Sequence, residues 1–154
     1  MKIHFLGANR QVTGSRYCLE AGGKQVMIDC GMFQERQFVS RNWEVNPIPP
    51  NTLDALVLTH AHLDHCGLIP RLVSNGFGGT IYSTRPTVDL AEVIMRDSAK
   101  IQEEDAAYKK KRHERDGRKG KHPPAALYNG TDVDQTMPLF QGCLRLRPPG
   151  QSVW

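Results

Sequence analysis

The chain has 154 residues, enough for one compact domain with a real core but not comfortably for two. A composition of 39% hydrophobic and 23% charged residues is ordinary for a globular protein and excludes disorder throughout. There is no run of about 18 apolar residues and no leader-like N-terminus, so we expect neither a membrane span nor export. Four cysteines without a CxxC pair favour reduced thiols in a cytoplasmic protein.

The positive charge is concentrated in one segment. The net charge is +4, and the stretch from Lys109 to His122 holds eight Lys/Arg against two acids, which leaves 12 basic and 14 acidic residues elsewhere. Such a segment can contact RNA phosphates, or it can be a solvated helix end whose cations suit the helix dipole. The residues available for a phosphate contact are Lys109, Lys110, Lys111 and Arg112.

The N-terminal third predicts strands and then an irregular connection. "KIHFL", "RYCLE" and "QVMID" alternate as in a β-meander, and Gly22-Gly23 predicts a hairpin between the second and third strands. Residues 32–51 end in "NPIPPN", whose prolines argue against regular structure.

Helices and strands alternate in the remainder, which predicts an α/β layered domain. Residues 53–58 form an apolar strand, "GLIPRLVSNG" a short helix closed by Gly76, and "GTIYST" another strand. Helical spacing then predicts one long helix from about 86 to 115 that frays within its lysines. "TDVDQTMPLF" suits a short helix with a capping box at Thr131 and Asp134.

The stretch "THAHLDHCG" follows an apolar strand and holds three of the six histidines. His60 and His62 are two residues apart, so on extended backbone their side chains point to the same side, and Asp64 and His65 follow where the chain turns. Imidazole and carboxylate are ligands that zinc accepts. Four ligands in so short a loop suit two metals about 3.5–4 Å apart better than one. We expect Cys66 to be a buried hydrophobe rather than a further ligand.

A metal pair of this kind lowers the pKa of a bridging water and stabilises charge on the attacked centre. The motif therefore predicts hydrolysis without a covalent enzyme intermediate.

The motif "HAHLDH" resembles the HxHxDH signature of the metallo-β-lactamase superfamily, which has an αββα fold. "LGANRQVTGSRYCLE", "MIDCGMFQ" and "IYSTRPTVDLAEVIMRDSAKIQEED" are similar to its β-CASP branch of RNA-processing nucleases. The resemblance implies that His60 and His62 bind one zinc and that Asp64 and His65 bind a second. It implies that Asp64 also orients the attacking water and is the catalytic residue. Asp29 would support the metal loop by hydrogen bonds without being a ligand.

The chain departs from the family pattern after His65. The family completes its site with two later histidines and a bridging aspartate, whereas this chain has only His113 and His122, both in the basic segment. We expect 1–142 to be the N-terminal part of the hydrolase domain, with a basic linker at about 109–124. The atypical tail at 143–154, "CLRLRPPGQSVW", suggests a reading frame disrupted near Gly142.

Three functions remain open at this point. The leading interpretation is a zinc-dependent ribonuclease, with RNA as partner, no membrane association and a possible homodimer; cleavage can be internal or from an end. The first alternative keeps the fold but hydrolyses a thioester, lactam or lactone. The second is a non-catalytic chain with half a metal site.

Overall fold

The computed structural model describes residues 1–116 and 125–143 of the chain. The end of the expected basic linker, 117–124, and the expected tail beyond Cys143 lie outside the described residues. Residues 109–116 continue the long helix. Within the described ranges, no helix combines the length and apolarity needed to cross a bilayer.

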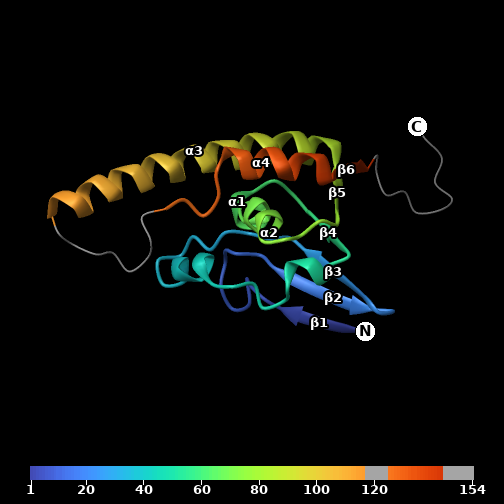
Figure 1. The fold of residues 1–154 in the computed structure, drawn as a ribbon. Helices are drawn as coiled ribbons and strands as arrows, with labels where there is room; N and C mark the ends of the chain where they lie inside the picture. Colours follow the sequence, from blue (N-terminus) through green and yellow to red (C-terminus); the bar gives the residue numbers. More distant parts are fainter. Residues whose placement is uncertain (117–124, 144–154) are drawn as a thin grey trace.

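Six strands form one mixed sheet in the order β1-β2-β3-β4-β5-β6 (Figure 1). The first three pair antiparallel and the last three extend the sheet in parallel. The strands are β1 (Lys2–Phe5), β2 (Tyr17–Ala21), β3 (Lys24–Ile28), β4 (Ala55–Val57), β5 (Thr80–Thr84) and β6 (Phe140–Cys143). The predicted hairpin is confirmed: Gly22 and Gly23 both have positive φ, as a tight turn between β2 and β3 requires.

The helices lie to one side of the strands in Figure 1, so the α/β layering is confirmed. They are α1 (Leu63–Cys66), α2 (Ile69–Ser74), α3 (Arg85–Asp116) and α4 (Gly130–Thr136), with 3-10 turns η1 (Val39–Trp43), η2 (Pro50–Thr52) and η3 (Met137–Leu139). The prediction of a long helix is confirmed, but this helix does not fray within its lysines. The connection 32–51 is not wholly irregular, because Pro50 begins the short turn η2, where a proline needs no N–H donor.

The core lies between the sheet and these helices. One residue from each of four adjacent strands stands in register on the helix-facing side, and all four are fully buried: Cys18, Met27, Leu56 and Ile81. Ile69 of α2, Met95 of α3 and Val133 of α4 belong to the same hydrophobic cluster. Because strand side chains alternate, residues next to these point to the opposite face.

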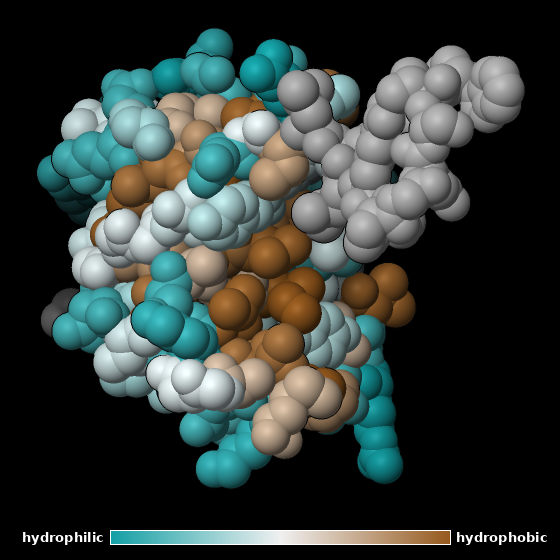
Figure 2. All heavy atoms as spheres, turned by 90° about the vertical axis from the view of Figure 1, so that its right-hand side faces the viewer, coloured by the Kyte–Doolittle hydropathy of each residue, from teal (hydrophilic) through white to brown (hydrophobic). Residues whose placement is uncertain are grey.

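That opposite face is apolar and partly open to solvent. Ile3 and Phe5 are 52% and 63% exposed, and Val57 and Tyr82 are also exposed. Figure 2 shows apolar side chains gathered on the side of the molecule that lies to the right in Figure 1. An apolar sheet face of this kind is typical of a surface that packs against another layer.

The capping box of α4 is not at Thr131 and Asp134, as the sequence suggested. The Asn129 side chain accepts from the Asp132 N–H at 3.1 Å, and the Asp132 carboxylate accepts from the Asn129 N–H at 2.8 Å. The helix therefore begins at Gly130, and the reciprocal bonds that satisfy its first N–H groups form two residues earlier than predicted.

Candidate metal centre

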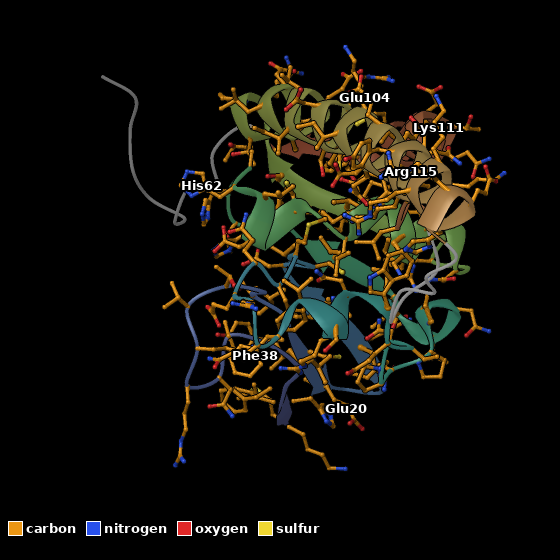
Figure 3. All side chains as sticks on the ribbon, turned by 90° about the vertical axis from the view of Figure 1, so that its left-hand side faces the viewer. Glu20, Phe38, His62, Glu104, Lys111 and Arg115 are labelled. Atoms are coloured by element: carbon orange, nitrogen blue, oxygen red, sulfur yellow. The ribbon has the colours of Figure 1, made fainter. Side chains whose placement is uncertain are left out.

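The histidine motif occupies the loop between β4 and α1. β4 ends at Val57, His60 and His62 lie in the loop, and Asp64 and His65 are in the first turn of α1. This is the carboxyl end of a parallel strand, flanked by β3 and β5, where α/β sheets commonly place their sites. His62 projects at the edge of the molecule in Figure 3.

Backbone hydrogen bonds fasten this loop to its neighbours. The N–H groups of Ser15, Cys30 and Met32 donate to the carbonyls of Asp64, His65 and Leu63 at 2.8, 2.8 and 3.1 Å, respectively. Gly31 lies so close to the loop that a Cβ added there would come within 1.6 Å of the Asp64 carbonyl oxygen. Only glycine permits this approach, so the segment after β3 sets the position of the histidine loop.

The first pair of potential ligands is His60 and His62. The His60 Nε2 and His62 Nδ1 atoms are 3.2 Å apart, and the two rings meet edge to face with centroids 4.7 Å apart. The prediction that both side chains point to one side is confirmed. Two nitrogens bound to one tetrahedral zinc at about 2.0–2.1 Å stand roughly 3.3 Å apart, so this spacing fits a shared ion.

The second pair is Asp64 and His65. The His65 Nε2 atom lies 3.6 Å from Asp64 Oδ2, and its other ring nitrogen, Nδ1, lies 2.7 Å from Asp29 Oδ2. A carboxylate only accepts hydrogen bonds, so the ring proton sits on Nδ1 and the Nε2 lone pair is left for a metal. Asp29 thus has the supporting position that the resemblance implied.

Thr59 joins the two pairs. Its hydroxyl lies 2.9 Å from Asp29 Oδ1 and 3.0 Å from His60 Nδ1. The hydroxyl has one hydrogen, which goes to the carboxylate, so it accepts from His60 Nδ1–H and leaves the His60 Nε2 lone pair for a metal. Ser15, whose hydroxyl donates to Asp29 Oδ2 at 3.1 Å, completes the same network.

Sequence reasoning missed Thr59 and Ser15. Thr59 directly precedes the motif, and Ser15 lies in "VTGS", a segment that contributed to the resemblance. Neither position carried a periodicity or a metal-ligand side chain that would have singled it out.

Electrostatics favour the neutral form of His60. Burial lowers the pKa of His60 below its ordinary value, and the neighbouring His65 and His62 lower it further. The neutral ring is the form that binds a metal. The side chains of Asp64 and His65 are 21% and 22% exposed, so the centre is open on one side.

The donors fit a metal as two half-sites. Within residues 1–116 and 125–143, no group of three or more His, Cys, Asp or Glu side chains forms a complete metal site. Each pair nevertheless brings two ligand atoms to a spacing suited to one ion, and the protons of His60 and His65 are held on Nδ1, away from their Nε2 lone pairs. The predicted ligands are therefore brought together, with positions left for further ligands or for substrate.

Comparison with known proteins agrees with this geometry. Residues 11–141 match the metallo-β-lactamase superfamily. The chain belongs to this superfamily. The αββα fold class expected from the sequence is confirmed for the part of the fold that the chain covers, and membership implies a divalent metal, typically zinc.

Nucleases are among the similar proteins, which confirms the likeness to the β-CASP branch. Ribonuclease TTHA0252 of Thermus thermophilus is 46% identical over 104 residues, 68% of this chain and 24% of the relative. Transcription termination factor FttA of Methanocaldococcus jannaschii is 36% identical over 104 residues, 66% of this chain and 16% of the relative. Human tRNase Z, short form, has a solved structure that is 23% identical, with a TM-score of 0.42, over 64% of this chain and 40% of that chain. The chain spans about a quarter or less of the length of the two curated relatives.

The remaining sequence candidates are Cys66, which directly follows His65, and the basic residues of α3. Cys66 is fully buried, its Sγ donates to the Ala61 carbonyl at 3.5 Å, and burial raises its pKa to about 12, which suits a packed thiol. The basic residues 109–112 are exposed on the last turns of α3. Figure 3 shows Lys111 and His62 on opposite sides of the view.

Proposed function

We propose that this chain forms the N-terminal part of a zinc-dependent hydrolase that cleaves RNA phosphodiester bonds. The paired donor arrangement at the β4–α1 loop carries the proposal, and the similarity to a ribonuclease supports RNA as the substrate class. The apolar sheet face fits the same interpretation, because an αββα fold buries such a face against a second sheet.

Each residue then has a defined part. His60 and His62 would hold one ion, and Asp64 and His65 would hold a second. When bound, the two ions supply a hydroxide at neutral pH and neutralise charge on the phosphate. Asp64 also orients the attacking water, the role that the resemblance implies.

The supporting residues act by fixing protons. Asp29 keeps the His65 proton on Nδ1, and Thr59 keeps the His60 proton on Nδ1. Partners of this kind commonly change metal affinity about 10–100-fold when they are lost.

Zinc binding by the 154-residue chain tests the metal part of this proposal without depending on turnover. Metal content and competition with a chelator should show zinc retained by the wild type and lost in His62→Ala. His4→Ala is the matched control, because His4 pairs with Glu20 at 3.2 Å on the first strands, away from the loop. Equal zinc retention in both variants would contradict the assignment.

Turnover separates the three functions. A labelled RNA hydrolysed in a zinc-dependent manner, with activity lost in His62→Ala, supports the ribonuclease. Hydrolysis of a chromogenic lactam but not of RNA favours the first alternative. Zinc binding without turnover of either substrate favours the non-catalytic chain.

The basic end of α3 is proposed as a separate RNA contact. Lys109, Lys110, Lys111 and Arg112 are exposed, and Lys109 pairs only loosely with Asp105, at 3.7 Å. Neutralising the three lysines to Gln should weaken RNA binding and reduce its salt dependence by about one phosphate contact per lysine. Salt-independent binding in the wild type would refute this contact.

A further inference from the structure

A small polar pocket lies where the start of β2, the turn η1 and helix α2 meet. It has a volume of about 20 Å³, enough to hold one oxygen-sized group, and it opens to solvent on one side. The polar residues that line it include Arg16, Arg41, Asn42, Glu44, Asn46 and Arg71. None of the metal-centre residues lines this pocket.

The pocket carries an excess of positive charge. Three arginines face one acid, Glu44, and Arg16 is only 7% exposed. None of the three forms an ion pair with a residue that the structure describes. A buried guanidinium without a counter-charge is unfavourable, so the protein is expected to recruit an anion there.

The arginines are held in place by contacts that leave donors over. The Arg41 guanidinium lies 4.3 Å from the centroid of the Phe33 ring, and that of Arg16 lies 5.8 Å from the same centroid. Arg71 lies over Trp43 and donates to the backbone carbonyls of Trp43 and Leu127 at 3.3 and 3.4 Å. Burial and the charge of Arg16 both lower the pKa of Arg71, which shows that the cations act on each other.

Buried polar atoms of the lining lack partners. The side-chain amide of Asn46, both Nδ2 and Oδ1, and Nε of Arg16 are buried and form no hydrogen bond with a described residue. Buried polar atoms in folded proteins are nearly always satisfied. The two nitrogens call for an acceptor, and Asn46 Oδ1 calls for a donor.

We propose that this pocket binds a phosphate group. Phosphate oxygens accept charge-assisted hydrogen bonds from arginine, frequently in bidentate geometry. A protonated phosphate oxygen also supplies the donor that Asn46 Oδ1 needs, which sulfate and chloride cannot. The pocket volume is large enough for one phosphate oxygen, so the rest of the phosphate group would lie at the solvent-exposed opening of the pocket. The source is inorganic phosphate or the terminal phosphate of a nucleotide.

Calorimetry and thermal unfolding of the 154-residue chain test this proposal, at slightly acid pH and constant ionic strength. Inorganic phosphate should bind saturably and raise the melting temperature more than sulfate or chloride does. A nucleoside 5′-monophosphate is measured in parallel. Tighter binding of the nucleotide than of inorganic phosphate identifies a nucleotide as the source, and tighter binding of inorganic phosphate identifies the free ion. Arg71→Gln should weaken phosphate binding about tenfold or more, because it removes a charged donor. The control is Arg36→Gln, since Arg36 is exposed and does not line the pocket.

A second variant keeps the proposal falsifiable if Arg71→Gln does not fold. Asn46→Asp places a fixed negative charge beside the arginines, so it should raise the melting temperature without phosphate and abolish the response to phosphate. Equal responses to phosphate, sulfate and chloride would overturn the proposal in favour of an ionic-strength effect. An unchanged phosphate response in Asn46→Asp or in folded Arg71→Gln would overturn it as well.

Discussion

Replacing Asp29 with asparagine should weaken zinc binding while the chain stays folded. Asp29 is 2% exposed and its carboxylate accepts from the Ser15 hydroxyl, from the N–H and hydroxyl of Thr59, and from His65 Nδ1. Asparagine has the same shape and tolerates the positive φ of 56° at this position. Asp29→Asn therefore changes the hydrogen-bonding pattern with little other disturbance.

The size of each effect follows from which bonds survive. The side-chain carbonyl of the introduced asparagine still accepts from Thr59, whereas its NH₂ group faces His65 and can only donate. His65 must then accept at Nδ1, which moves its proton to Nε2 and removes the lone pair that would bind a metal. The bonds from Thr59 lose their charge assistance, and the Ser15 hydroxyl must turn to accept from the new NH₂ group, so the free energy of unfolding should fall by about 1–3 kcal/mol. Zinc affinity should fall about 10–100-fold.

Three measurements check this reasoning. Urea unfolding in chelator gives the stability change, chelator competition gives the zinc affinity, and ¹⁵N spectra of the imidazole report which His65 nitrogen carries the proton. Ser15→Ala is the control, because it removes one donor to Asp29 and leaves the His65 bond intact. If Asp29→Asn keeps the proton on Nδ1 and zinc affinity within about twofold of wild type, Asp29 does not set the tautomer.

Other single contacts give further expected outcomes. Thr59→Val should lower zinc affinity more than Thr59→Ser does, because only serine keeps the hydroxyl that receives the His60 proton; equal losses by equilibrium dialysis would count against this role. Leu56→Ala, in the fully buried row of the sheet, should reduce the free energy of unfolding by about 2–5 kcal/mol in urea, and a loss below about 1 kcal/mol would mean that the site collapses around the missing atoms. Burial raises the pKa of Cys66 from 9.0 to about 12, so as the pH rises the unfolded chain loses the thiol proton before the folded chain does. The free energy of unfolding should therefore be unaffected by this group below pH 9.0 and should fall between pH 9.0 and about pH 12. At neutral pH, iodoacetamide should label Cys66 only as fast as the chain unfolds, and faster labelling would show an accessible thiol.

Local structure and the candidate ligand set could be predicted from residues that are neighbours in the sequence. Alternation of apolar residues placed the first three strands, two glycines placed the hairpin, and helical spacing placed α3, whereas β6 was not predicted. His60 and His62 point to one side because two residues of extended backbone separate them. Such features depend on short stretches of chain, so periodicity and spacing predict them.

The local sequence pattern gave the wrong capping box for α4, because two overlapping pairs of residues could each have formed it. The sequence offered Thr131 and Asp134 as a capping box, yet Asn129 and Asp132 form it. Helix α4 begins at Gly130 and packs on the core through Val133 and Thr136, which are fully buried. Tertiary contacts override a cap whose own contribution is only about 1 kcal/mol.

The proton arrangement at the metal centre and the arginine pocket were decided only by the tertiary structure. Asp29 meets His65 across 36 positions of sequence, and the pocket unites Arg16, Arg41 and Arg71 from three separate segments of the chain. No periodicity reports which side chains will meet over such separations, because the meeting depends on strand order, on the approach that Gly31 permits and on how helices cover the sheet. The sequence by itself thus indicated which residues are candidate metal ligands, and the fold decided which of their lone pairs hydrogen bonding leaves free.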